Sequence, residues 1–256
     1  MAVNIAIVNQ KGGVAKTTTA IELCACFENR GYKSLLVDMD EQIDASKYMG
    51  TDYTKPGVYN VLSGEVNIKD AIQHTEEFDI LSGSGRLGKA DVEFSELSDL
   101  TKLKDAFDDI DDIYDFIVID THPARNKLLQ LTLIATDYVI VPTDTDDGSI
   151  DGIRAVFNDV NEYRGKFSTA EVMGVVFARY EKSSVHSYAE EQIEEIIKEQ
   201  NSDAFFMKVR KAVASSEAKA ERQSLQKGKK NSNPAMDYRR VADEIIDRVL
   251  EESDEA

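Results

Sequence analysis

One short stretch of the chain, NQKGGVAKTTT at residues 9–19, restricts its possible folds more than any other feature. It comes directly after the apolar run VNIAIV and before a segment whose apolar residues recur at helical spacing. A strand, a glycine-containing turn and a lysine–threonine pair at the start of a helix form a cradle for phosphate, because backbone N–H groups and the positive helix end face the anion. Such a loop needs one lysine, and this stretch contains two, Lys11 and Lys16.

The stretch departs from the usual pattern of a phosphate loop, which has glycine at two fixed positions before the lysine. Gln10 and Ala15 occupy those two positions here. We expect a negative φ at Ala15, since its methyl group has to fit beside the phosphates. We also expect nucleotide binding to survive this change.

Short apolar runs alternate with helical patterns along the rest of the chain. Helical spacing is present at 17–31, 126–135, 149–165 and 187–200, and a helix with proline in its first turn is predicted at 234–252. Strands are predicted at 3–9, 34–39, 78–81, 115–120, 137–142, 171–177 and 204–209. Most of these runs are apolar on both faces, as strands of a parallel sheet under helices are. We therefore predict an α/β fold, a doubly wound and predominantly parallel sheet flanked by helices on both faces.

Composition limits the class of protein further. A chain of 256 residues without an internal repeat or a linker rich in Gly, Pro or Ser is predicted to form a single domain, 1–256. Its apolar runs of about six residues are far shorter than the roughly 20 that cross a bilayer, and no secretory signal is recognised, so we expect a cytoplasmic protein. Cys24 and Cys26 are interpreted as small core residues. The formal charge of −18 requires that any anionic partner meet a local basic patch.

The loop fits a deviant form of the phosphate loop (the deviant Walker A pattern), K-G-G-x-x-K-T, in which Lys11 precedes the two glycines. Two further blocks place aspartates behind apolar strands: KSLLVDMDEQIDAS at 33–46 and YDFIVIDTHP at 114–123. In order and spacing, the three blocks resemble the short ParA-type (Soj-like) partition ATPases of the ParA/MinD family over essentially all 256 residues. The resemblance implies a P-loop NTPase fold and weak ATPase activity that uses ATP and Mg²⁺.

The resemblance also implies a homodimer that forms around ATP, with Lys11 reaching across the interface to the nucleotide of the partner. Two triphosphates that face each other repel, and a lysine from each subunit replaces that repulsion with charge-assisted hydrogen bonds. ADP lacks the γ-phosphate, so hydrolysis is expected to release the subunits. The alternative is a solvated loop lysine in an ordinary nucleotide-binding protein.

By the same resemblance, Asp40 positions or activates the attacking water, Asp38 helps to organise the magnesium site, and Asp120 acts on magnesium through a water. Taken alone, such strand-ending carboxylates would be read as caps of the next turn. The residues expected in catalysis are Lys11, Lys16 and Asp40. Those expected to bind the nucleotide are Lys11, Gly12, Gly13, Val14, Ala15, Lys16, Thr17 and Thr18, and those expected at the metal are Thr17, Asp38 and Asp120.

Three nearby features complete the predicted site. His122 stands where the family commonly has proline, and we expect it to change the stiffness of its loop rather than the chemistry. For Arg125, sensing of phosphate and pairing with an acidic neighbour both stay open. The run TDTDDGSIDG at 143–152 superficially resembles a calcium loop but has Gly148 and Ala155 where ligands are required, so we reject calcium. The resemblance places this run near the adenine and the dimer seam.

A basic segment at 208–230 holds eight Lys or Arg against two Glu, a local charge of about +6. Such a segment can neutralise several phosphates without reading bases, which predicts nonspecific, salt-sensitive DNA binding. The residues expected to contact DNA are Lys208, Arg210, Lys211, Lys219 and Arg222. A merely solvated helix and turn is the alternative for this segment.

We therefore predict an ATP-dependent DNA partition ATPase that segregates a plasmid, mobile element or chromosome region. ATP-bound dimers would associate with the nucleoid, and a ParB-like centromere-binding protein would stimulate hydrolysis. The acidic C-terminal sequence IIDRVLEESDEA offers no basic amphipathic helix, so no membrane partner is expected. The alternatives are a ParA/MinD-like positioning ATPase for a protein or membrane cargo and a metabolic P-loop enzyme.

Overall fold

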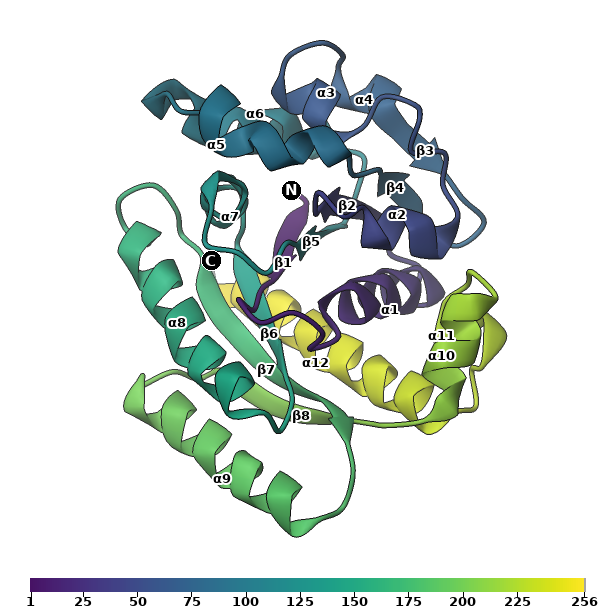
Figure 1. Cartoon of the computed structure of the whole chain (residues 1–256), viewed down its shortest axis with the longest axis vertical. Coiled ribbons are helices and arrows are strands. Elements are labelled where there is room, and N and C mark those ends of the chain that lie inside the picture. The colour runs from purple at the N-terminus through teal and green to yellow at the C-terminus, as the bar shows by residue number, and fades with distance from the viewer. Residues whose placement is uncertain (256) are drawn as a thin grey trace.

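An eight-stranded sheet forms the centre of the computed structural model, which describes residues 1–255 apart from the side chains of Asp147 and of residues 253–255 (Figure 1). The strands are β1 (Val3–Ile7), β2 (Ser34–Met39), β3 (Ile72–His74), β4 (Asp79–Leu81), β5 (Phe116–Thr121), β6 (Tyr138–Thr143), β7 (Glu171–Tyr180) and β8 (Phe205–Arg210). Their order in the sheet is β3-β4-β2-β5-β1-β6-β7-β8, and every neighbouring pair except β3–β4 is parallel. The predicted doubly wound, mostly parallel fold is confirmed.

Helices cover both faces of this sheet. One face carries α1 (Lys16–Asn29), α2 (Asp44–Met49), α10 (Val213–Ala220), α11 (Leu225–Gly228) and α12 (Asn233–Glu255). The other carries α3 (Val58–Leu62), α4 (Ile68–Ala71), α5 (Ala90–Glu93), α6 (Lys102–Asp108), α7 (Lys127–Ile134), α8 (Asp147–Tyr163) and α9 (Ser184–Glu199). Two 3₁₀ turns, Gly85–Lys89 and Leu97–Thr101, precede α5 and α6.

Alternation along each strand supplies the two apolar layers. In β1, Ile5 and Ile7 face α1 and α12, whereas Ala6 packs with the helices of the opposite face. All three side chains are fully buried. Because both faces are covered, the strands read as continuous apolar runs, which is why the sequence pattern located them.

The helix that follows the phosphate loop is buried on more than one side. α1 and α12 lie beside each other on the same face of the sheet (Figure 1), and residues 19–27 of α1 are all buried. Cys24 and Cys26 are among them and are free, in agreement with their interpretation as core residues. The Tyr238 hydroxyl of α12 lies 3.1 Å from the Thr19 hydroxyl of α1, so the two helices also share a buried polar contact.

The carboxyl ends of the three central strands meet at one edge of the sheet. The register places Asp38 of β2 opposite Asp120 of β5, and Asp120 opposite Ile7 of β1. Ligands of open α/β sheets bind at this edge. The fold therefore brings both aspartates next to the loop that follows β1.

Part of the architecture was not predicted. β3 is a three-residue antiparallel strand at the sheet edge, and its sequence, Ile-Gln-His, has no apolar run. The short helices between β2 and β5 span four to seven residues, too few for helical periodicity to be recognised. No helix in the described part of the chain is long and apolar enough to cross a membrane.

Candidate nucleotide-binding site

The loop between β1 and α1 reverses the chain through two residues in the left-handed region. Gly13 has φ 80° and Ala15 has φ 71°. The prediction of a negative φ at Ala15 was wrong. Ala15 is the N-cap of α1. The backbone must turn sharply at this residue for the first helical N–H groups to point into the loop. An alanine in this conformation costs on the order of 1–2 kcal/mol, which the surrounding structure has to offset.

Lys16 is directed into the loop. Its side chain is buried, and its Nζ donates a hydrogen bond to the carbonyl oxygen of Lys11 at 3.0 Å. Burial lowers the pKa of the Lys16 amine, and the negative charges of Asp120 and Asp40 oppose that shift. The amine is thus a positive charge inside the cradle, and no carboxylate of the described side chains is in direct contact with it.

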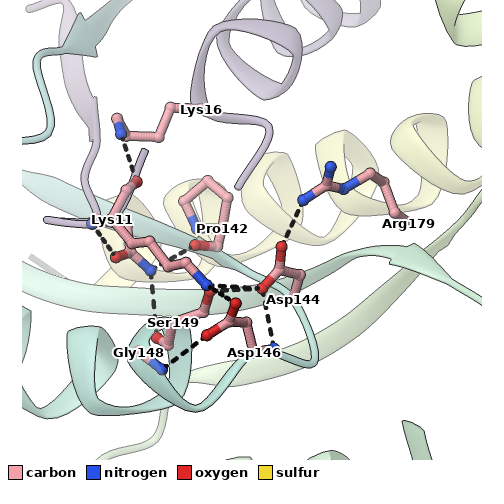
Figure 2. A network of polar contacts seen from close by, with 9 residues as sticks. Lys11, Lys16, Pro142, Asp144, Asp146, Gly148, Ser149 and Arg179 are labelled. Atoms are coloured by element: carbon pink, nitrogen blue, oxygen red, sulfur yellow. Dashed lines mark hydrogen bonds and ion pairs between the residues drawn. The ribbon is translucent and has the colours of Figure 1, made fainter. Parts of the chain in front are cut away.

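Lys11 is directed away from the loop. Its Nζ lies 2.6 Å from Asp146 Oδ2 and 3.9 Å from Asp144 Oδ1, at the start of α8, and Figure 2 shows the side chain extending toward these carboxylates. Its backbone N–H donates to Asn9 Oδ1 at 2.9 Å, and Asn9 Nδ2 donates to the carbonyl oxygen of Pro142 at 2.8 Å. Asn9 therefore ties the loop to the end of β6.

Asp120 is a buried carboxylate without a hydrogen-bond partner. Both of its oxygens are inaccessible, and neither accepts a hydrogen bond. Burial raises the pKa of Asp120 well above its ordinary value, and the neighbouring Asp38 adds to the rise. Thr17 and Lys16 oppose the rise, although the Thr17 hydroxyl does not reach hydrogen-bond geometry. A buried carboxylate that lacks a partner marks a place for a cation or an ordered water.

Asp38 is held by its own chain instead. Its Oδ2 accepts hydrogen bonds from the Ser46 N–H at 2.9 Å and the Ser46 hydroxyl at 2.6 Å, and its Oδ1 accepts from the Asp40 N–H at 3.2 Å. Burial raises the pKa of Asp38 to about 6, against these hydrogen bonds. Gly83 packs so closely on Asp38 that an added Cβ would lie 2.9 Å from it. This arrangement suits a residue that organises the site indirectly.

Asp40 follows β2 and lies at the same edge. Its side chain is nearly buried, and its Oδ1 accepts from the Gln42 N–H at 2.8 Å. His122 Nε2 lies 3.9 Å from Asp40 Oδ1 and 3.8 Å from Glu41 Oε1, whereas His122 Nδ1 is buried without a partner. The histidine is thus close to the predicted catalytic aspartate but forms no direct hydrogen bond with it.

The donor set fits a magnesium ion that is held mainly by a nucleotide. Mg²⁺ in phosphate-transfer sites typically uses one or two protein oxygens together with phosphate oxygens and waters. Thr17 and the unpartnered Asp120 supply oxygens of this kind. Among the side chains that the structure describes, no group of three or more His, Cys, Asp or Glu is arranged to hold a metal ion alone.

A cavity of about 440 Å³ adjoins the loop. Ala15 and Thr18 line it from the loop side, Arg179 from the end of β7, and Val213 and Tyr238 from α10 and α12. Its lining is mixed apolar and polar, as expected for a nucleoside next to a phosphate cradle. A larger cavity of about 770 Å³ lies near Glu171 and Asp203, among charged residues outside the predicted site.

Several contacts of the site were not predicted. Asp159 of α8 accepts from Gln10 Nε2 at 2.7 Å and pairs with Arg125 Nε at 2.8 Å. Arg125 also pairs with Glu162, so of the two alternatives for Arg125 the structure shows the acidic pairing. The aspartates at the start of α8 were likewise missed as partners of Lys11. The only sequence signal for them was an aspartate at a helix N-cap position.

The basic segment at 208–230 is largely neutralised within the chain. The ion pairs of the residues predicted to contact DNA are Lys208–Glu190 at 2.5 Å, Arg210–Asp237 at 2.7 Å and Lys211–Glu181 at 3.1 Å. Arg210 binds Asp237 through two nitrogens and thereby ties β8 to α12. Lys219 and Arg222 are exposed and form no ion pair among the described residues; the Lys219 amine lies 5.8 Å from the centre of the Tyr48 ring.

Comparisons with known proteins agree with this geometry. The model of the AAA domain family (AAA_31) matches residues 2–172. The chromosome-partitioning ATPase Soj of Thermus thermophilus is 30% identical over 249 residues, which cover 96% of each chain. A putative plasmid partition protein of Borrelia burgdorferi bound to AMPPNP has a TM-score of 0.78 at 25% identity, over 98% of this chain and 100% of that chain. An ATP complex of a variant of Cyanothece McdA has a TM-score of 0.85 at 17% identity over 96% of each chain, which shows the fold alone.

The matched family model covers more than half of the chain, and the similarity to Soj spans nearly the whole of it. The eight-stranded, mostly parallel sheet with helices on both faces matches the fold of these solved structures. The chain is therefore a member of the AAA domain family and, within it, a P-loop ATPase of the ParA/MinD group related to Soj and ParA.

Proposed function

We propose that this protein is a magnesium-dependent partition ATPase that dimerises around two ATP molecules and binds nonspecific DNA as the dimer. Hydrolysis, stimulated by a ParB-like partner, would release the subunits and the DNA, and so move or position a plasmid, mobile element or chromosome region. The relatives named chromosome-partitioning ATPase and plasmid partition protein support this assignment.

One observation carries the proposal: the two lysines of the loop point in different directions. Lys16 is buried and turned toward the phosphate cradle, while the side chain of Lys11 is 27% exposed and turned outward. The cradle therefore has its own cation in Lys16. An outward lysine beside the phosphates is suited to a triphosphate that belongs to a second subunit.

The chain's own residues would divide the chemistry as follows. The loop N–H groups and Lys16 would bind the phosphates, and Thr17 and Asp120 would hold Mg²⁺, which on binding neutralises charge on the transferred phosphoryl group. Asp40 would orient the attacking water, because it lies at the same sheet edge and is held by the Gln42 N–H. Asp38 would keep the start of α2 in place through Ser46.

The DNA contacts would rest on fewer residues than the segment's charge implies. Lys219 and Arg222 are the two of the five predicted contacts that lack an ion pair within the described chain. Exposed cations without an internal carboxylate retain their full charge for phosphates. We therefore assign the main DNA role to these two residues and a structural role to Arg210.

The pairing of Lys208, Arg210 and Lys211 also favours a second candidate function. A positioning ATPase for a protein cargo would share the ATP switch but would not need a strongly basic face. A membrane cargo has less support, because the apolar face of α12 is buried against α1 and offers little apolar surface to a lipid interface.

Retention on DNA separates the two functions. Purified protein is passed over immobilised DNA of arbitrary sequence with ATP and magnesium, with ADP and magnesium, or without nucleotide, at rising salt. The partition ATPase is retained only with ATP and is lost as salt rises, because its binding releases counterions from phosphates. Equal absence of retention in all three conditions would exclude the DNA role and leave the protein-cargo function.

A further inference from the structure

We propose that Asp146 is an internal latch for Lys11: in the nucleotide-free subunit it occupies the amine that the ATP dimer needs, and it thereby opposes dimerisation. The inference rests on the proposed function, because it concerns the lysine that would cross between subunits. It adds a residue that sets how readily the dimer forms.

The contact itself is direct. Asp146 Oδ2 lies 2.6 Å from Lys11 Nζ, and the stem of Lys11 runs past Gly148, where an added Cβ would lie 3.8 Å from the Lys11 Cδ (Figure 2). Lys11 is the leading cause of a lowered pKa of Asp146, followed by the hydrogen bond from the Gly148 N–H. The amine is thus held beside the N-terminus of α8 by its own chain.

Asp144 contributes differently. It lies 3.9 Å from the Lys11 amine, and its oxygens already accept from the Ser149 hydroxyl at 2.5 Å and from the Arg179 guanidinium. If Lys11 leaves, Asp144 keeps both of these partners, whereas the Asp146 side chain keeps, among the described groups, only the Gly148 N–H at 3.2 Å. The hold on Lys11 therefore depends mainly on Asp146.

The ion pair between Asp146 and Lys11 can break at low cost. The Asp146 side chain is 64% exposed, so water can replace the amine as soon as it departs. An exposed ion pair of this kind shifts the equilibrium between the bound and the released Lys11 amine by up to about five-fold. Two latches open when two subunits associate, so the expected effect on the dimer dissociation constant is up to about 25-fold.

Asparagine is the suitable replacement, because it removes the charge and keeps the cap. Asp146 is the N-cap of α8 and accepts from the Gly148 N–H, and Asn is an equally good N-cap residue. Asp146→Glu keeps the charge. Asp108→Asn is the matched control, since it removes one exposed carboxylate at the end of α6, which precedes the start of β5 and so lies away from the loop.

The first measurement is the reactivity of Lys11 in the nucleotide-free protein. The four full-length proteins are treated with a trace of an amine-acylating reagent, and modification at Lys11 is followed by mass spectrometry. Asp146→Asn is expected to accelerate it about two- to five-fold, while the other two variants match the wild type. An unchanged rate in Asp146→Asn overturns the latch and leaves the proposed function intact.

The second measurement is the dimer dissociation constant by sedimentation with AMPPNP and magnesium. Asp146→Asn is expected to dimerise about 4- to 25-fold more tightly than wild type and Asp108→Asn. If wild type dimerises and Asp146→Asn dimerises equally well, the latch is wrong. If no protein dimerises, the proposed function fails and the regulatory role fails with it, whatever the acylation rates show.

Discussion

Lys16 donates its side-chain hydrogen bond to the carbonyl oxygen of Lys11, at 3.0 Å. In the nucleotide-free subunit the Lys16 amine therefore binds the backbone carbonyl of Lys11 inside the phosphate cradle. The Lys11 side chain extends in the opposite direction (Figure 2). Because the two amines point to different places, a substitution of one lysine leaves the contacts of the other side chain in place. Each lysine can therefore be tested alone.

Lys16→Ala should weaken ATP binding strongly. The Lys16 amine lies within the cradle, and losing a charge-assisted hydrogen bond to phosphate costs about 1.5–3 kcal/mol, or roughly 10- to 150-fold in affinity. The affinity is measured by calorimetric titration with ATP and magnesium. Lys198→Ala, an exposed lysine in the last turn of α9, is the control and should bind as wild type does. Wild-type affinity in Lys16→Ala would show that the cradle lies elsewhere.

Asp40→Asn should bind ATP but hydrolyse it slowly. The Asp40 carboxylate lies at the carboxyl edge of the sheet and is not held by another side chain at hydrogen-bond distance, so it is available to a water. Loss of such a group typically lowers a rate about 10²- to 10⁴-fold. Single-turnover assays with labelled ATP measure the chemical step. A wild-type rate in the variant would move the role to another residue.

Lys219→Ala combined with Arg222→Ala should weaken ATP-dependent DNA binding and reduce its dependence on salt. Each phosphate contact contributes about 0.9 to the slope of the logarithm of affinity against the logarithm of salt, so the slope should fall by roughly two for each subunit. Lys208→Ala is the control, because Lys208 is paired with Glu190. Fluorescence anisotropy over a salt series gives the slopes. Equal slopes for the double variant and wild type would contradict the assignment.

Glu22→Gln should change how stability depends on pH. Glu22 is fully buried on α1 and accepts from the Leu225 N–H at 2.7 Å and from Gln226 at 3.2 Å, and burial raises its pKa to about 8. Its neutral form is favoured in the folded state, so its contribution to stability is complete below pH 4.5 and is lost as pH rises through 8.

Between pH 5.5 and 8, wild type should therefore lose about 3 kcal/mol of unfolding free energy relative to Glu22→Gln. Urea unfolding at both pH values gives the difference, and other titrating groups cancel because both proteins contain them. Glu195→Gln, at an exposed position of α9, should follow wild type. Parallel pH profiles for wild type and Glu22→Gln would refute a buried neutral carboxyl.

The sequence predicted the sheet and the phosphate edge well because both are set by local rules. Each central strand is apolar on both faces, and a glycine-rich turn before a lysine has few uses other than to hold an anion. Periodicity and motif spacing carry that information directly. The seven strands predicted are all present, and Asp38 and Asp120 meet at the edge because the strands are parallel.

The rest depends on contacts between distant segments. The φ of Ala15 follows from how the loop must wrap before α1, and residue type alone favoured the other sign. Whether Lys208 carries free charge depends on Glu190, which belongs to another helix. The partner of Lys11 is 135 residues away in sequence, at a helix start that gives no sign of what it faces. Such pairings appear only when the fold is complete.

The role of Lys11 between subunits is tested by the mass of the protein in solution with ATP, with ADP and without nucleotide, for wild type and Lys11→Ala side by side. Magnesium is present throughout, and ATP binding by the variant is checked first, so that a lost dimer is not confused with a lost ligand. We expect wild type to double in mass only with ATP, and Lys11→Ala to bind ATP and stay monomeric. A variant that doubles in mass as readily as wild type would contradict the claim that Lys11 joins the two subunits.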